Sequence, residues 1–180
     1  NDYISKNKDW QYTLWNEEKI EELFQSKIKD NLIKVLYKIY NQEVTMMGKS
    51  DIARILILYY YGGIYIDADS VWINNKSLNP LIEESLEKGF FCALEQEGCP
   101  HITNGVVGSI PKHKNLLKLI NILSNYEDKY LQLREKYQPW ELTGPLLINQ
   151  LNRSTLTLFP SIYFYPISWH GITDCHLHKK

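Results

Sequence analysis

The feature that most constrains this chain is a single apolar stretch bounded by charged residues at both ends. It reads SDIARILILYYYGGIYIDADSVWI from Ser50 to Ile73. Asp51 and Arg54 lie near its start, and Asp67 and Asp69 lie near its end. A segment this apolar belongs in a protein core, where charged groups are costly unless they have partners. The stretch therefore predicts a buried element that carries four charges to the edge of the core.

The stretch divides into a helix followed by a strand. Ser50 is a typical N-cap residue, and Gly62 and Gly63 end the helix before the β-prone run Ile64–Ile66. Because the helix is apolar on almost every side, we expect it to be central and buried.

Asp67 and Asp69 are two residues apart where this strand ends. If the extended backbone persists, both carboxylates and the ring of Tyr65 lie on one face of the sheet. Two adjacent carboxylates favour a hard cation such as Mn²⁺ or Mg²⁺, whose other ligands are water and phosphate oxygens. An Asp-x-Asp sequence also occurs in solvated turns. The motif alone thus leaves a metal-diphosphate site and an ordinary turn both open.

Asp51 and Arg54 are three residues apart, which places them on one face of the predicted helix. They can form a structural ion pair. A buried ion pair stabilises a fold only weakly, however, because desolvation offsets most of the Coulomb attraction. A carboxylate beside a guanidinium is also suited to hydrogen bonding with sugar hydroxyls, so a ligand is the second interpretation.

The rest of the chain alternates between helical and strand-like patterns. Helices are predicted after an N-cap at Asn16, around residues 32–39 and 81–88, from Pro111 through residue 120, and from Thr143 and Pro145 onward. Strands are predicted at residues 10–15, 90–96, 102–109, 154–159 and 162–167. This interleaving indicates an α/β fold with a mixed sheet flanked by helices, in one domain over residues 1–180.

Composition excludes several classes of partner. Twenty Lys and Arg residues against twenty-one Asp and Glu give a formal charge of -1, which offers no basic face for nucleic acid. No apolar run is long enough to span a membrane, and the compartment stays undetermined. Three cysteines without a CxxC spacing argue against a disulfide framework, although a bridge between Cys92 and Cys99 stays open. The chain begins with Asn1, so we expect a fragment.

Histidine and tryptophan residues supply weaker candidates. The five histidines are scattered and are expected to be incidental, with His170 and His176 as remote metal-binding candidates. Trp140 and Trp169 offer flat apolar surface on which a sugar or a base could stack.

The run S-D-I-A-R followed by L-Y-Y-Y-G-G-I-Y-I-D-A-D resembles the sugar-binding region of DXD-motif glycosyltransferases of the family 32 type. That family includes initiating α-mannosyltransferases and capsular polysaccharide sugar transferases, and the large clostridial glucosylating toxins carry a similar block. Weaker similarity extends over residues 10–24, 102–109 and 142–151. The family's first strand, of Pro-Lys-Ile-Ile-His type, and its terminal His-rich segment ending in Ser-Trp are absent, which fits a chain that is incomplete at one or both termini.

The resemblance implies a GT-A-like (Rossmann-like) fold and transfer of a sugar from a UDP- or GDP-sugar to a glycan or protein acceptor. It also implies Mn²⁺ or Mg²⁺ as cofactor and retention of configuration at the anomeric carbon. Asp67 and Asp69 would serve the metal and the diphosphate, with Asp67 also near the ribose. Asp51 and Arg54 would hold the donor sugar, and Tyr65 would shape the floor of the site.

Two further residues follow from the same resemblance. Asn104, in the Thr-Asn-Gly sequence, and Thr143, in the Thr-Gly-Pro sequence, are candidates for the sugar or acceptor side. The catalytic set is then Asp51, Arg54, Asp67 and Asp69.

Two other functions stay open. One is a sugar- or nucleotide-binding module, or an inactive fragment, that binds without turnover. The other is a Mg²⁺-dependent phosphohydrolase with an Asp-x-Asp nucleophile pair. That class places the motif after an early first strand and adds a later Lys with an acidic pair, whereas here the motif follows a Gly-Gly turn and a helix with Asp and Arg, so it ranks lower.

Overall fold

The computed structural model describes residues 10–71, 77–96 and 98–166. Its centre is a four-stranded sheet in the order β1-β3-β2-β4. The strands are β1 (Gly63–Ile66), β2 (Phe90–Leu94), β3 (Ile102–Ser109) and β4 (Thr157–Phe159). β3 is antiparallel to both β1 and β2, and β2 is parallel to β4. The predicted α/β class with a mixed sheet is therefore confirmed.

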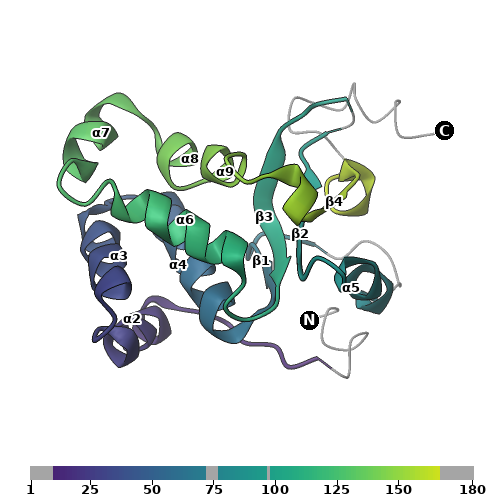
Figure 1. Ribbon diagram of the computed structural model, residues 1–180, viewed down its shortest axis with the longest axis horizontal. Helices are drawn as coiled ribbons and strands as arrows, with labels where there is room; N and C mark the ends of the chain where they lie inside the picture. Colours follow the sequence, from purple (N-terminus) through teal and green to yellow (C-terminus); the bar gives the residue numbers. More distant parts are fainter. Residues whose placement is uncertain (1–9, 72–76, 97, 167–180) are drawn as a thin grey trace.

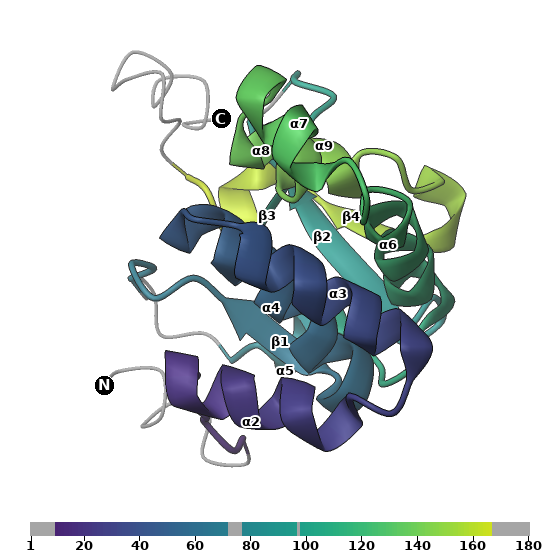
Figure 2. The same cartoon turned by 90° about the vertical axis from the view of Figure 1, so that its left-hand side faces the viewer.

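Most of the helices lie on one side of the sheet, and α5 lies on the other (Figure 1). The helices are α2 (Glu17–Lys27), α3 (Asn31–Gln42), α4 (Met46–Tyr61), α5 (Asn79–Ser85), α6 (Lys114–Ser124), α7 (Tyr130–Lys136), α8 (Pro139–Leu142) and α9 (Pro145–Ile148). Figure 2 shows α2 and α3 towards the viewer, with α4 between α3 and the sheet. In the described part of the chain, none of the helices combines the length and apolarity that crossing a membrane requires.

Helix α4 is the core of the molecule, as its sequence predicts. Every residue from Asp51 to Leu58 is buried. The helix ends at Gly62, whose φ of 66° favours glycine, and a Cβ there would lie 2.6 Å from Cδ of Pro111. Gly62 thus ends the helix and lets the chain enter β1 beside the loop that follows β3.

The predicted start of this helix at Ser50 is wrong. The helix begins at Met46 after the N-cap Thr45, whose side chain accepts a hydrogen bond from the Gly48 amide at 3.2 Å. The Ser50 hydroxyl donates to the Met46 carbonyl at 2.7 Å inside the first turns. Thr45 is an equally good cap residue, and tertiary contacts select it.

Glu43 supplies those contacts. Its side chain is buried and accepts hydrogen bonds from the Thr45 amide at 2.8 Å and the Thr45 hydroxyl at 2.6 Å. It also accepts from the Tyr130 hydroxyl at 2.5 Å and from Nε of Arg134 at 2.8 Å. Burial raises the pKa of Glu43, but the bonds from Thr45 and Tyr130 and the Arg134 charge together hold it below its usual value. One carboxylate therefore ties α7 to the start of α4.

Two predicted strands are wrong. Residues 10–15 form no strand, and their aromatic rings are held individually: Trp10 Nε1 donates to Asn79 Oδ1 at 2.8 Å, and the Trp15 ring lies 5.5 Å from the Tyr61 ring. No strand of the described residues pairs with this segment. The stretch from residue 162 begins inside a 3-10 turn, Ser161–Tyr163, after Pro160 ends the sheet pairing.

Cys92 is buried and Cys99 is partly exposed, and both are free thiols, so the bridge between them does not form. The remaining helix and strand predictions between residues 17 and 159 match described elements to within a few residues.

Replacing Glu43 with Ala should destabilise the fold by about 3 kcal/mol, because the change leaves the buried Tyr130 hydroxyl and the partly buried Arg134 guanidinium without this acceptor. Urea unfolding measures this. The matched control is Glu127→Ala, which removes a surface ion pair with Lys38 at 3.0 Å and should leave the urea midpoint almost unchanged. Equal midpoints for the two variants would contradict the anchoring role of Glu43.

Candidate functional site

Arg54 lies at the centre of the charged cluster and links α4 to the end of β1. Its Nη2 atom lies 3.1 Å from Oδ1 of Asp51 and 3.0 Å from Oδ1 of Asp67. The guanidinium carbon lies 4.7 Å from the centre of the Tyr65 ring, in a cation-π contact. The Arg54 guanidinium therefore links Asp51, near the start of the apolar stretch, to Asp67, near its end.

Asp51 is buried, with a side chain only 3% exposed. Its Oδ1 accepts a hydrogen bond from Nδ2 of Asn104 at 2.7 Å, and its Oδ2 accepts from the Thr143 hydroxyl at 3.2 Å. Burial raises the pKa of Asp51 to about 6, against the opposing effects of Arg54, Asn104 and Thr143. The two weaker sequence candidates thus converge on Asp51 from separate parts of the chain.

These two partners come from β3 and from the end of α8. Asn104 lies in β3, and its carbonyl accepts a hydrogen bond from Nη1 of Arg54. Thr143 follows α8, and its single hydroxyl proton is shared between Asp51 and the Pro139 carbonyl, which lies 3.0 Å from the hydroxyl oxygen. At the next residue, Gly144, a Cβ would lie 2.9 Å from Oδ2 of Asp51, so glycine permits this close approach.

Asp67 is the first residue after β1, and its amide donates to the Gly105 carbonyl at 2.9 Å. The prediction that Asp67 and Asp69 share a face of a continuing strand is wrong. The Ser70 amide bonds to the Asp67 carbonyl at 3.0 Å, so the chain turns and Asp69 is exposed on that turn. Burial raises the pKa of Asp67, the Arg54 charge lowers it and the nearby Asp69 charge raises it.

The donor set of Asp67 and Asp69 fits a hard divalent cation. Both groups supply carboxylate oxygens, and Asp69 faces solvent, which leaves room for water and phosphate oxygens as further ligands. Asp51, Asp67 and Asp69 with Arg54 carry a formal charge of about -2, which a divalent cation would balance. In the described residues, no group of three or more His, Cys, Asp and Glu side chains is arranged to hold a metal by itself.

Tyr165 is a site residue that sequence reasoning missed. A Cβ on Gly105 would lie 2.8 Å from the Tyr165 hydroxyl oxygen and 2.9 Å from Oδ2 of Asp67, so both atoms crowd the same glycine. The Thr103 hydroxyl donates to Tyr165 at 3.0 Å. Burial raises the pKa of Tyr165 to about 12, so the phenol is neutral near pH 7. Its segment reads as a strand in sequence and gives no signal of this contact.

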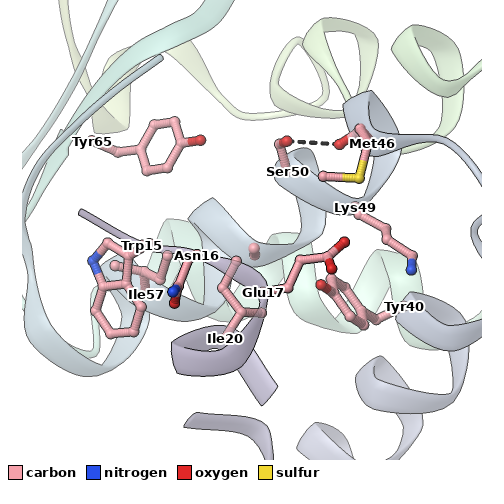
Figure 3. A pocket seen from close by; sticks show the side chains of 11 residues that line it. Trp15, Asn16, Glu17, Ile20, Tyr40, Met46, Lys49, Ser50, Ile57 and Tyr65 are labelled. Carbon is pink, nitrogen blue, oxygen red and sulfur yellow. Dashed lines mark hydrogen bonds between the residues drawn. The ribbon is translucent and has the colours of Figure 1, made fainter. Parts of the chain in front are cut away.

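A pocket of about 310 Å³ adjoins this cluster and shares Tyr65 with it. Figure 3 shows the Tyr65 hydroxyl directed towards Ser50 and Met46, with Trp15 and Asn16 on the opposite side. The lining combines aromatic and aliphatic surface with a few polar groups, which is typical of small-molecule pockets. Its remaining lining residues are Glu17, Ile20, Tyr40, Lys49, Ala53 and Ile57.

The other sequence candidates are placed as follows. Trp140 is 46% exposed on α8, where its Cα would lie 2.8 Å from a Cβ on Gly144. His113 caps α6 by accepting from the Asn115 amide at 3.1 Å, and His101 is exposed. His170, His176 and Trp169 lie outside the described residues.

Comparison with known sequences confirms the resemblance to DXD-motif glycosyltransferases. Residues 1–87 match the family described as glycosyltransferase sugar-binding region containing DXD motif. A mannosyl phosphorylinositol ceramide synthase of Saccharomyces cerevisiae is 32% identical over 68% of this chain and 28% of its own length. An inositol phosphoceramide mannosyltransferase of Schizosaccharomyces pombe is 30% identical over 90% of this chain and 47% of its own length. The chain thus spans less than half of each of these two relatives.

A glycosyltransferase of Acanthamoeba polyphaga mimivirus, itself uncharacterized, is 30% identical over 89% of this chain and 62% of its own length. Among solved structures, the PaToxG glycosyltransferase superposes with a TM-score of 0.54 at 18% identity, over 83% of this chain and 58% of that one. The UDP-bound glycosyltransferase domain of the YGT toxin gives 0.50 at 12% identity, over 81% and 53%. These likenesses show that the fold is of the GT-A type.

The buried Asp51 predicts a specific pH dependence of stability. Its pKa is about 6 in the folded state and 3.8 in the reference state, so the folded protein holds an extra proton between these pH values. The free energy of unfolding therefore falls as pH rises through that window, by about 3 kcal/mol for this group. Urea unfolding from pH 4 to 7 should show wild type losing this amount relative to Asp51→Asn.

The control for this experiment is Asp128→Asn, which changes a carboxylate that is 95% exposed. Its difference from wild type should stay constant with pH. A constant difference between wild type and Asp51→Asn would show that Asp51 titrates normally and would contradict the prediction.

Proposed function

We propose that this chain is part of the catalytic domain of a metal-dependent, retaining glycosyltransferase that uses a nucleotide-sugar donor. The observation that carries the proposal is the pairing of Arg54 with both Asp51 and Asp67, at 3.1 and 3.0 Å, inside a matched DXD sugar-binding region. The Arg54 guanidinium holds Asp51, the proposed sugar-binding carboxylate, close to Asp67, the proposed diphosphate-binding carboxylate. This proximity supports a role for both carboxylates in positioning the two parts of a sugar-diphosphate donor.

Asp67 and Asp69 would hold Mn²⁺ or Mg²⁺, which supplies Lewis-acid stabilisation of the departing diphosphate. Arg54 adds a fixed positive charge next to Asp67, where it can stabilise the same negative charge. Because Arg54 is buried, it needs little reorganisation to do so. Arg54, and Asp67 and Asp69 through the metal ion, would thus stabilise the negative charge of the departing diphosphate on one side of the site.

Asp51 is proposed to hold the donor sugar. Hydrogen bonds from Asn104 and Thr143 fix its carboxylate, and the same two residues are proposed as contacts on the sugar or acceptor side. A buried carboxylate can orient the sugar ring and exclude water from the anomeric carbon. Retention of configuration follows from the family resemblance, and no residue is assigned as a covalent nucleophile.

The nucleoside is proposed to occupy the pocket of Figure 3. Tyr65 borders both the pocket and the Arg54 cluster, so a ligand can extend from one to the other past its ring. The Trp15 ring offers a flat surface for a base, and Asn16 and Ser50 offer polar groups. The YGT toxin domain with UDP has the same fold type, which supports a nucleoside diphosphate as ligand.

The relatives suggest the sugar and the acceptor to test first. The Schizosaccharomyces pombe relative is named as a mannosyltransferase that acts on inositol phosphoceramide. We therefore propose mannose as the first donor sugar and inositol phosphoceramide as the first acceptor, ahead of other glycans and of proteins.

A non-catalytic binding module is the second candidate function, because the chain spans only 28% to 62% of the curated relatives described above. Binding of a donor without its breakdown would indicate this function. The phosphohydrolase alternative is less favoured, since Oδ1 of Asp67 is already paired with Arg54 and is thus a poor nucleophile.

Incubation of this chain with Mn²⁺ and a panel of UDP- and GDP-sugars, mannose donors included, should release nucleoside diphosphate from one donor, detected by mass spectrometry. Chelator should abolish the release. Asp69→Asn should lower it by about a hundredfold, because a metal-binding carboxylate is lost from the exposed turn.

Asp128→Asn is the matched control and should keep wild-type turnover, because Asp128 is exposed and pairs only with Lys38 among the described residues. Circular dichroism checks that both variants fold. Turnover that is unaffected by Asp69→Asn would refute the metal assignment. Binding of a donor without turnover would favour the binding module.

A further inference from the structure

The Tyr165 hydroxyl stands at the Asp67 end of the charged cluster, on the side formed by β3. Its oxygen and Oδ2 of Asp67 both lie within 3 Å of the point that a Cβ on Gly105 would occupy, at 2.8 and 2.9 Å. Glycine at this position lets a phenol and a carboxylate approach the same small space. The Tyr165 hydroxyl is therefore a further polar group beside Asp67, and it comes from the C-terminal end of the described residues.

Hydrogen bonding fixes the direction of this hydroxyl. The Thr103 oxygen accepts from the Gly105 amide at 3.2 Å, so the Thr103 proton is free to go to Tyr165, at 3.0 Å. Because Thr103 donates to it, the Tyr165 phenol keeps its own proton for another acceptor. Oδ2 of Asp67 is a charged group near this hydroxyl, since both atoms crowd the position of a Cβ on Gly105.

The ring of Tyr165 is held firmly enough to act as a fixed donor. It packs against a small apolar cluster that includes Phe91, Val106 and Phe159. Its amide donates to the Ser161 carbonyl at 2.6 Å, and Ser161 is buried. A donor positioned in this way loses little entropy when it binds a ligand oxygen.

We propose that the Tyr165 hydroxyl is a ligand-binding group that donates a hydrogen bond to a diphosphate oxygen held at Asp67. The inference rests on the proposed function, because it takes the diphosphate of the nucleotide sugar as the ligand. Arg54 already occupies Oδ1 of Asp67, so Oδ2 is the oxygen left for a metal ion that would hold the diphosphate at this residue. Tyr165 is the neutral donor beside Oδ2, and it adds affinity without altering the charge balance of the metal site.

Calorimetric titration of the full chain tests this, with Mn²⁺ alone and with Mn²⁺ plus pyrophosphate, UDP or GDP. Tyr165→Phe keeps the ring and removes only the hydroxyl, so diphosphate affinity should fall by about tenfold while the affinity for Mn²⁺ alone stays at the wild-type value. Tyr163→Phe is the matched control, because Tyr163 lies two residues away with a side chain that is 51% exposed. Its diphosphate affinity should equal that of wild type.

Thr103→Val is a second variant that keeps the phenol but removes the bond that orients it, and it should weaken diphosphate binding by a smaller factor. Wild-type diphosphate affinity in Tyr165→Phe would overturn the proposal and leave the proposed function intact. An equal loss of affinity for Mn²⁺ alone would also overturn it, because Tyr165 would then only position Asp67. If wild type and Asp67→Asn both failed to bind diphosphate, the proposed function itself would fall.

Discussion

The pairing of one guanidinium with two carboxylates is the interaction on which the rest of this structure depends. Arg54 projects from the most buried helix, and its Nη2 atom contacts Asp51 in the same helix and Asp67 after β1. Without Arg54, two carboxylates would face each other in a largely apolar surrounding, which is strongly unfavourable. The Arg54 guanidinium therefore fixes α4 relative to the sheet. It also determines where a second positive charge, such as a metal ion, could be accommodated.

The sequence predicts much of this arrangement because local patterns encode it. The buried helix ending at Gly62, the strand that follows, and β3 over residues 102–109 all agree with the structure. The ion pair of Asp51 and Arg54 follows directly from helical spacing. Elements whose borders depend on tertiary contacts are less predictable: the helix starts at Met46, where Glu43 positions Thr45, and not at Ser50.

The convergence of distant segments on the site is the part that local patterns do not contain. Asn104 and Thr143 were candidates only through family resemblance, and Tyr165 gave no signal at all. Gly105 and Gly144 explain why these contacts are hard to predict, since each glycine lets the backbone approach one carboxylate. A Cβ on Gly105 would lie 2.9 Å from Oδ2 of Asp67, and a Cβ on Gly144 would lie 2.9 Å from Oδ2 of Asp51. The informative residues at these points are small ones, whose role appears only once their neighbours are known.

The charge balance of the site connects its stability to its function. Burial raises the pKa of both Asp51 and Asp67, so keeping both carboxylates ionised lowers the free energy of unfolding. A divalent cation at Asp67 and Asp69 would relieve that cost, and an anionic diphosphate would then find Arg54 and the cation on one side and a phenol on the other. If the proposed metal and diphosphate bind here, binding and folding are coupled through the same four charges that bound the apolar stretch, because the ligand would complete their neutralisation.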